Sequence, residues 1–322
     1  MINKLWITWN IQRRNVSLSS AIGATLEELI STASNWVRYP LLATKTIKLI
    51  VNQRPDQIYA QNPSLVLAFL VSIVGKILKT PVIIDLHNAG LFPMEGKSKV
   101  LNRIALEVNA LADIVIVTNE ELRRCLINRN VRSVVMPDPI PDFGDTDSYN
   151  MDIDKFNVVY ICSWASDEPN ANVIEAAKIL GKEFRIYITG KPKLSGMDIN
   201  ASEMSNIILT GYLSNNEYES LLSSADAIMV LTTRDDCLVC GAYEGVSVEK
   251  PLVISDTKAL REYFCSGCEY TDNSASDIAA SILQVKKNYS SLKKDISVLK
   301  QMKIPELENS IQNLNSQLES LR

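Results

Sequence analysis

Residues 225–256 read ADAIMVLTTRDDCLVCGAYEGVSVEKPLVISD. Two apolar runs rich in β-branched residues, 227–231 and 251–255, predict buried strands. Between them a polar loop gives way to a helical pattern at 241–249. A strand, a helix and a second strand in this order predict a parallel βαβ unit. The loop therefore leaves the carboxyl end of a strand, which is where open parallel sheets bind ligands.

The same alternation of strands and helices runs through most of the chain. The other strands are expected at 5–9, 57–61, 82–85, 113–118, 133–136, 157–162, 184–189, 206–210 and 269–271. The other helices are expected at 65–78, 99–112, 175–180, 216–225, 258–264 and 277–287. The segment 65–78 is apolar all round, which predicts a helix buried against a sheet.

Residues 136–150, MPDPIPDFGDTDSYN, interrupt this pattern with three prolines and four aspartates and predict an interdomain linker. The fold class is therefore α/β, with two Rossmann-like domains whose parallel sheets face each other across a cleft. We assign residues 1–142 to the first domain, 143–290 to the second and 291–322 to a C-terminal helical tail.

The tail carries an amphipathic helix after Pro305. Its apolar residues repeat at spacings of three and four over two heptads: Leu307, Ile311, Leu314, Leu318 and Leu321. Such a short stripe predicts either a terminal helix that packs on the body of the chain or a homo-oligomer contact.

Composition is that of an ordinary soluble globular protein, with 322 residues, 46% hydrophobic residues, 22% charged residues and a net charge of −4. It excludes disordered, collagen-like and small disulfide-rich proteins. The start of the chain lacks the pattern of a secretory signal, so a cytoplasmic location with reduced cysteines is expected. The longest apolar run, 65–74, is too short to span a membrane.

Asp236 and Glu244 are the first candidates for chemistry. Asp236 lies in the loop after the strand, and Glu244 lies about one turn into the following helix. Two carboxylates so placed can accept hydrogen bonds from sugar hydroxyls. Alternatively, both are capping groups that favour the helix N-terminus.

This segment resembles the E-x7-E segment of family 4 glycosyltransferases of the GT-B fold. Seven residues separate Asp236 from Glu244, and KPLVISD follows at 250–256, although Asp236 replaces the first Glu and Glu249 a Gly. Other segments agree in order: RPD at 54–56, IDLHN at 84–88, VVYI at 158–161, IILTGYLSNNEY at 207–218 and ADAIMV at 225–230. The resemblance covers about residues 1–290.

The resemblance implies a retaining glycosyltransferase in surface polysaccharide or glycoconjugate synthesis. The second domain would grip a nucleotide-sugar donor, the first would present a glycan or lipid-linked acceptor, and neither a cofactor nor a metal would be needed. The catalytic candidates are His87 and Asp236. The donor-binding candidates are Glu244, Arg234, Lys191, Lys193, Cys237, Cys240 and Gly241, and the acceptor-side candidates are Asn88, Arg13 and Arg14.

His87 is the only histidine and follows the strand at 82–85. It can donate a hydrogen bond to the transferred sugar or carry a proton; alternatively, it is a structural loop residue. Asp85 is expected to orient this loop.

One departure from the family concerns the diphosphate. Residues 162–170, CSWASDEPN, lack the Arg and Lys that members often carry after the first strand of the second domain. Lys191, Lys193 and Arg234 are the expected substitutes. Because these phosphate contacts are missing, two alternatives stay open: a GT-B sugar epimerase, and a catalytically silent sugar-nucleotide binder or assembly subunit.

Charge is unevenly distributed, with a net charge of +5 in residues 1–142 and −9 in the remainder. The basic residues of the first part include Arg13, Arg14, Arg38, Lys45, Lys48, Lys76 and Lys79. Near an apolar helix they suit an anionic bilayer or a lipid-diphosphate acceptor, which predicts peripheral attachment to the inner face of the plasma membrane. The alternative is a set of scattered, solvated charges. The acidic total disfavours nucleic-acid binding.

Two C-x2-C pairs, Cys237 with Cys240 and Cys265 with Cys268, resemble a zinc site by spacing alone. We expect no zinc, because a βα unit should place the two pairs at opposite edges of the sheet.

Overall fold

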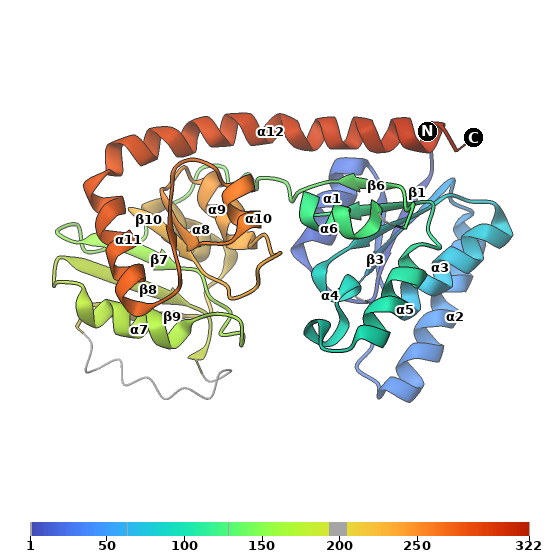
Figure 1. The fold of residues 1–322 in the computed structure, drawn as a ribbon, viewed down its shortest axis with the longest axis horizontal. Coiled ribbons are helices and arrows are strands. Elements are labelled where there is room, and N and C mark those ends of the chain that lie inside the picture. Colours follow the sequence, from blue (N-terminus) through green and yellow to red (C-terminus); the bar gives the residue numbers. More distant parts are fainter. Residues whose placement is uncertain (1, 63, 128, 193–204, 322) are drawn as a thin grey trace. The chain divides into compact units, whose positions relative to one another are not determined.

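The computed structural model describes residues 2–62, 64–127, 129–192 and 205–321 (Figure 1). The chain divides into two compact units. Unit 1 comprises Met1–Pro139 together with Glu306–Arg322, and unit 2 comprises Ile140–Pro305. The division falls in the proline-rich segment, slightly before the boundary expected at residue 142, and the end of the chain belongs to unit 1 instead of forming a separate tail.

Unit 1 is built on a six-stranded parallel sheet in the order β2-β1-β3-β4-β5-β6. Its strands are β1 (Lys4–Thr8), β2 (Thr25–Glu28), β3 (Gln57–Asn62), β4 (Val82–Leu86), β5 (Ile114–Val117) and β6 (Ser133–Val135). Its helices are α1 (Arg13–Ile22), α2 (Asn35–Gln53), α3 (Leu65–Leu78), α4 (Asn88–Leu91), η1 (Pro93–Gly96), α5 (Lys99–Asn109) and α6 (Glu120–Ile127).

Alternate residues of the unit 1 strands point to opposite faces of the sheet, and a hydrophobic core lies on each face. Ile7 of β1 and Ile58 of β3 pack with Leu42 of α2 and Val71 of α3 on one face. Trp6 of β1 points to the other face, where it packs with Leu18 of α1 and Tyr59 of β3. Because both faces are covered, the strands are apolar almost without interruption, and this is why their positions are readable in the sequence.

Unit 2 repeats this plan with a six-stranded parallel sheet in the order β12-β11-β10-β7-β8-β9. Its strands are β7 (Phe156–Tyr160), β8 (Phe184–Thr189), β9 (Ile207–Gly211), β10 (Ala227–Val230), β11 (Leu252–Ser255) and β12 (Cys268–Thr271). Its helices are α7 (Asn170–Ile179), α8 (Asn215–Ser224), α9 (Cys240–Ser247), α10 (Lys258–Tyr263), α11 (Ala275–Lys287) and the first part of α12 (Tyr289–Glu319).

The predicted α/β class with two parallel sheets is confirmed. Among the elements that the sequence analysis did not predict are β2 and α2. The strand β2 is half-exposed and carries two glutamates, and α2 contains Pro40 together with several β-branched residues, so the local propensity for each element is low. The helix α3 lies against the sheet with Leu67 and Val71, as predicted, and on its other side Val66, Phe69 and Ile77 face solvent. No described helix is long and apolar enough to cross a membrane.

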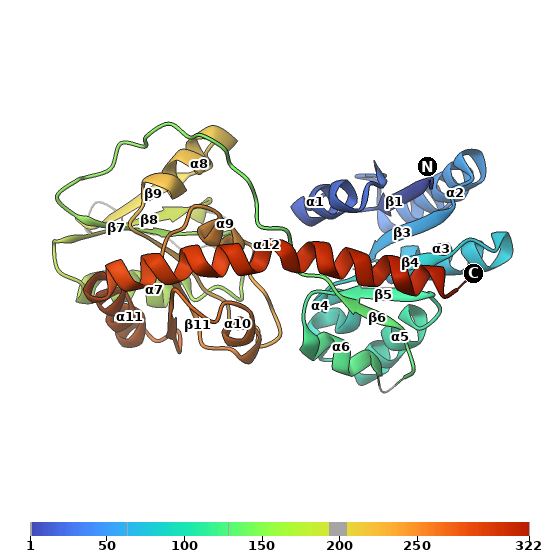
Figure 2. The same ribbon diagram turned by 90° about the horizontal axis from the view of Figure 1, so that it is seen from above.

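The C-terminal helix differs from the prediction of a short helix after Pro305. The helix α12 is continuous from Tyr289 to Glu319 and contains Pro305 within it (Figure 2). Pro305 removes one backbone hydrogen bond, but packing holds the helix on both sides of it. Before Pro305, Ile296 and Leu299 are fully buried in the unit 2 core.

After Pro305, the whole predicted heptad stripe packs inside unit 1. Leu314 and Leu318 are buried beside Trp6 and Tyr59, and the other three stripe residues lie partly buried at the edge of the same cluster. Of the two alternatives predicted for this stripe, the structure has the terminal helix that packs on the body of the chain.

We predict that Leu314→Ala destabilises unit 1 by about 2–5 kcal/mol, because it removes a fully buried side chain and leaves a cavity. Gln312→Ala, on the exposed side of the same helix, is the matched control and should change stability by less than about 0.5 kcal/mol. Urea unfolding followed by tryptophan fluorescence measures both variants. Equal stability of the two variants, or a Leu314→Ala protein that changes only its oligomeric state, would contradict this packing.

Candidate functional site

The strand order of unit 2 reverses beside β7. The chain continues from β7 to β8 and β9 on one side and later adds β10, β11 and β12 on the other. The loops that follow β7 (residues 161–169) and β10 (residues 231–239) therefore diverge at the carboxyl edge of the sheet. Crevices of this kind bind ligands in open parallel sheets.

The side chain of Glu168 holds the loop after β7 through hydrogen bonds. Glu168 accepts hydrogen bonds from the backbone N–H of Ser163 at 3.0 Å, from the Ser163 hydroxyl at 2.9 Å and from the backbone N–H of Ala165 at 2.8 Å. Backbone N–H groups that converge in a loop, such as those of Ser163 and Ala165, can bind an anion. Here Glu168 supplies the anion, so these groups are already occupied.

The loops after β7 and β10 are tied together through Asp167. Its carboxylate accepts from the Thr232 hydroxyl at 2.9 Å and lies 3.2 Å from the guanidinium of Arg234, and its backbone oxygen accepts from the Thr233 N–H at 2.7 Å. Half of the Arg234 side chain is exposed, at 51%. Arg234 is therefore held at this edge and still accessible to an anionic ligand.

Glu244 lies one turn into α9 and is only 7% exposed. Its carboxylate accepts a hydrogen bond from the hydroxyl of Tyr218 on α8. Asp236 is half-exposed in the loop that precedes α9. The structure thus places both predicted carboxylates at the carboxyl edge of the unit 2 sheet.

Gly241 has a packing role. A Cβ atom at this position would come within 3.0 Å of side-chain atoms of Ile161 and Val230. The glycine therefore lets α9 approach β10 and the end of β7 closely. The geometry favours this role over the predicted donor contact.

The other donor-side candidates have different surroundings. Lys191 is exposed after β8, with its Nζ 5.7 Å from the centre of the Tyr212 ring. Lys193 lies outside the described residues. Cys237 is half-buried in the loop after β10, and Cys240 is exposed at the first residue of α9.

The two cysteine pairs lie at opposite edges of the unit 2 sheet, as expected. Cys268 begins β12 and pairs with Leu252, the first residue of β11, which places it at the amino edge. Cys237 and Cys240 follow the carboxyl end of β10. Within the parts of the chain that the structure describes, no group of three or more His, Cys, Asp or Glu side chains is arranged to hold a metal ion.

In unit 1 the strand order reverses between β1 and β3, and polar side chains meet there. The Gln61 side-chain oxygen accepts from the Thr8 hydroxyl at 3.0 Å and from the Asn15 amide at 2.9 Å. The Gln61 amide nitrogen lies 3.2 Å from Nε2 of His87. Sequence analysis missed Thr8, Asn15 and Gln61. The available signal was that Thr8 and Gln61 are polar residues near the carboxyl ends of apolar strands.

A buried ion pair between Arg14 and Asp85 lies next to His87. Arg14 is 4% exposed and Asp85 is 1% exposed, and the guanidinium lies 2.9 Å from the carboxylate. Arg14 also donates to Asp138 and to the backbone oxygen of Met136. Arg14 is therefore engaged inside unit 1, and the geometry does not favour its predicted role as an acceptor contact.

Burial alone would raise the pKa of Asp85, but Arg14 and His87 outweigh burial and hold this pKa well below its usual range. Asp85 Oδ2 lies 3.2 Å from Nε2 of His87, whose side chain is 25% exposed. Asp85 is thus an ionised carboxylate in contact with His87, a residue of the loop that it was expected to orient. Arg13 is exposed at the start of α1, and Asn88 is the half-buried first residue of α4.

Comparison with solved structures identifies the fold. Anabaena HepE in complex with UDP and glucose matches with a TM-score of 0.78 and 13% identity, over 99% of this chain and 100% of that one. Sucrose-phosphate synthase from Thermosynechococcus elongatus matches with a TM-score of 0.77 and 12% identity, over 100% of both chains. A Listeria monocytogenes protein described as a UDP-N-acetylglucosamine 2-epimerase matches with a TM-score of 0.70 and 12% identity, over 99% and 96%.

At these identities the similarity establishes the fold, which is GT-B. No family model matches the chain, and no curated protein matches it in sequence.

We predict that Arg14→Met lowers the stability of unit 1 by about 3–5 kcal/mol, because it leaves Asp85 buried without its guanidinium partner. Asp85→Asn should lower it by about 1.5–3 kcal/mol, because Arg14 loses one charged partner and keeps Asp138. The double variant Arg14→Met/Asp85→Asn should cost less than the sum of the two single changes. Glu120→Gln, which breaks the exposed pair with Arg123 in the same unit, is the control and should cost about 0–1 kcal/mol. Urea unfolding at neutral pH gives these values.

The pH dependence has a defined sign. Because the folded-state pKa of Asp85 is lowered, its stabilising contribution is complete above the ordinary aspartate pKa of about 3.9 and is lost as pH falls from there through the folded-state pKa. Asp85→Asn should therefore flatten the acid limb of the stability profile. An Asp85→Asn protein as stable as Glu120→Gln at neutral pH would contradict this assignment.

Proposed function

We propose that this chain is a retaining glycosyltransferase that moves a sugar from a nucleotide-sugar donor to a glycan or lipid-linked acceptor in the synthesis of a surface polysaccharide or glycoconjugate. We place this reaction at the cytoplasmic face of the membrane. The supporting observation is the position of Asp236 and Glu244 at the carboxyl edge of the unit 2 sheet. It is joined by similarity along the whole chain to a protein solved with UDP and glucose.

Glu244 is proposed to bind the ribose of the donor. Its carboxylate already accepts a hydrogen bond from the hydroxyl of Tyr218, so it is suited to hydroxyl donors. A ribose hydroxyl would use the same acceptor chemistry. Asp236, in the more exposed loop, is proposed to contact the transferred sugar.

The diphosphate of the donor needs positive charge from outside the loop after β7, since Glu168 already occupies its N–H groups. Arg234 and Lys191 are the proposed cations, because their loops follow β10 and β8, the two neighbours of β7. The first turn of α9 adds a favourable dipole and contains no acidic residue.

In unit 1, His87 is proposed to hold a hydroxyl at the reaction centre. The ionised Asp85 accepts a hydrogen bond from Nε2–H of His87 at 3.2 Å, and this contact orients the ring so that Nδ1 would accept from the hydroxyl. Transfer would break the bond between the anomeric carbon and the phosphate oxygen and form one from that carbon to the acceptor oxygen. The acceptor proton would pass to the departing diphosphate, so no protein nucleophile is required.

Two other functions have a specific observation in their favour. A sugar-nucleotide epimerase is supported by the similarity to the Listeria protein and needs no acceptor. A silent sugar-nucleotide binder is supported by Glu168, which takes up N–H groups that a phosphate could otherwise use. Release of free nucleoside diphosphate only in the presence of acceptor would separate the transferase from both.

We predict that Glu244→Gln weakens nucleotide-sugar binding about tenfold or more, because a charge-assisted hydrogen bond contributes about 1.5–3 kcal/mol. Asp236→Asn should lower turnover more than affinity. Glu175→Gln, on the exposed surface of α7, is the control and should change neither quantity. Calorimetric titration with UDP-, GDP- and ADP-sugars and a nucleoside diphosphate release assay give the two readouts.

Tyr218→Phe separates ligand binding from folding at Glu244, since it removes the hydroxyl contact and keeps the carboxylate. This variant should retain nucleotide binding. Unaltered affinity and turnover in both Glu244→Gln and Asp236→Asn would refute the donor-site assignment.

We predict that His87→Ala lowers turnover about 100-fold, as expected when a hydrogen bond that positions a reacting group is lost, and leaves nucleotide affinity unchanged. The reason is that His87 belongs to unit 1, whereas the proposed donor residues belong to unit 2. Steady-state kinetics and titration measure the two effects. If thermal stability and turnover fall together in His87→Ala, the residue has a structural role instead.

A further inference from the structure

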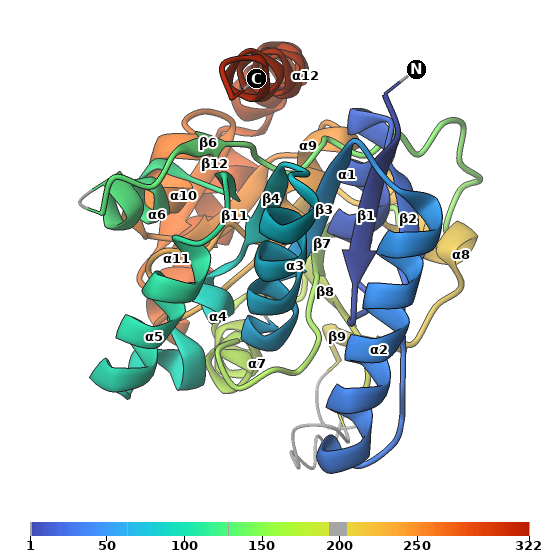
Figure 3. The same cartoon turned by 90° about the vertical axis from the view of Figure 1, so that its right-hand side faces the viewer.

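Unit 1 carries a broad apolar surface on the side of α2, α3 and α5 that faces away from the sheet. The helix α2 packs beside α3, and α3 beside α5 (Figure 3). The residues that we call the apolar face are exposed to between 36% and 92%: Trp36, Val37, Ile47, Val51, Val66, Phe69, Ile73, Ile77, Val100 and Ile104.

The unit 1 core does not require these side chains. The helix α2 buries Leu42 and Ile50, and α3 buries Leu67 and Val71, on their sheet-facing sides. The apolar face is therefore a second apolar stripe on helices that already have one. Single exposed apolar residues are ordinary, but a group on adjacent helices marks an interaction surface.

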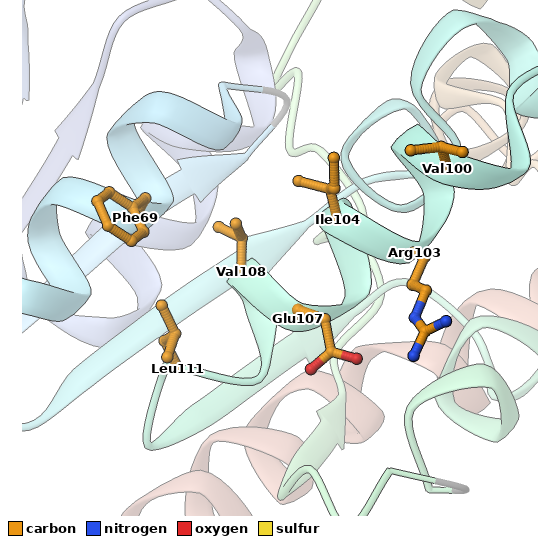
Figure 4. Close-up of a pocket in the computed structure, with 7 residues that line it drawn as sticks. All are labelled: Phe69, Val100, Arg103, Ile104, Glu107, Val108 and Leu111. Carbon is orange, nitrogen blue, oxygen red and sulfur yellow. The ribbon is translucent and has the colours of Figure 1, made fainter.

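A groove of about 580 Å³ between α3 and α5 continues this surface (Figure 4). Its apolar lining is formed by Phe69, Val100, Ile104, Val108 and Leu111, and Arg103 and Glu107 complete it. In Figure 4, Phe69 and Leu111 lie on the same side of Val108, and Arg103 and Glu107 extend away from Phe69. The apolar face is therefore hollowed between α3 and α5.

The charge of this layer is opposite to that of the whole chain. The helices α2, α3 and α5 carry six basic residues, Arg38, Lys45, Lys48, Lys76, Lys99 and Arg103, and one acidic residue, Glu107. Glu107 is paired with Arg129 at 2.7 Å, so its charge is already compensated. The net charge of the chain is −4, which makes this layer a basic region on an acidic protein.

We propose that the apolar face docks unit 1 on an anionic lipid bilayer. Trp36, at 92% exposure, and the aliphatic side chains would enter the interface. The exposed Lys45 and Lys48 lie on α2 within one turn of Leu41 and Val51, so their ammonium groups can reach anionic headgroups while their stems cover apolar surface.

The chemistry favours a bilayer over a protein partner. Protein interfaces are depleted in lysine, whereas basic residues near an anionic membrane each contribute about 1 kcal/mol. This inference adds a docking surface and a lipid charge to the membrane location proposed above, and it does not depend on the transfer reaction. A test without nucleotide or acceptor therefore distinguishes failure of one from failure of the other.

The test is co-flotation of the full chain with vesicles. One set contains phosphatidylcholine with about 30% phosphatidylglycerol, and the other contains phosphatidylcholine alone. We expect binding to the anionic vesicles, and loss of most of it between about 0.1 M and 1 M salt, because screening weakens the attraction of exposed charges. Binding to neutral vesicles should be at least about tenfold weaker.

Two variants test the two parts of the face separately. Lys45→Gln/Lys48→Gln should lower the partition coefficient for anionic vesicles about tenfold or more, as expected for two charges near the surface. Trp36→Ser/Ile77→Ser should lower it by a similar factor. The matched controls in unit 2 are Lys287→Gln/Lys294→Gln and Ile153→Ser, the latter at 94% exposure, and neither should alter binding.

An unchanged thermal unfolding temperature shows that a variant is folded. If Trp36→Ser/Ile77→Ser does not fold, Val100→Ser on α5 replaces it as the apolar variant. The proposal is overturned if the chain does not float with anionic vesicles, or if the variants and the controls bind alike. It is also overturned if the chain self-associates without lipid and Trp36→Ser/Ile77→Ser abolishes that association, because the face would then be covered by a second copy.

Discussion

Parallel pairing of strands is the constraint on which both units depend. Parallel strands need long crossovers, so helices cover the two faces of each sheet, and every carboxyl end meets at one edge. The candidate functional side chains therefore lie at that edge. In unit 2 the loops at this edge hold Asp167, Arg234 and Asp236, and in unit 1 the same edge holds Gln61 and His87.

This constraint explains what could be predicted. Buried strands of apolar and β-branched residues gave accurate positions; β8 (Phe184–Thr189), for example, has the predicted bounds. Contacts between residues distant in sequence could not be predicted. Arg14 and Asp138 are 124 positions apart, and only the fold shows that Arg14 is buried in an ion pair instead of facing an acceptor. Likewise, nothing in residues 162–170 reveals that Glu168 folds back onto the N–H groups of its own loop.

The terminal helix and the apolar face show that one apolar stripe can be buried in the fold while another is exposed. The stripe of α12 is covered within unit 1, where Leu314 is fully buried. The outer stripe of α2 and α3 has no such cover, as Trp36 and Ile77 show by their exposure. Amphipathic spacing is the same signal in both cases, and burial in the fold separates a packing helix from a candidate docking surface.

The proposed function requires that a nucleotide sugar binds at the carboxyl edge of the unit 2 sheet. Hydrogen–deuterium exchange of the full chain, with saturating UDP-, GDP- and ADP-glucose in turn, tests it most directly. We expect at least one of them to slow exchange in residues 161–169 and 231–247, the loops after β7 and β10 and the helix α9. Slowed exchange confined to unit 1, or no change with any of the three, would contradict it.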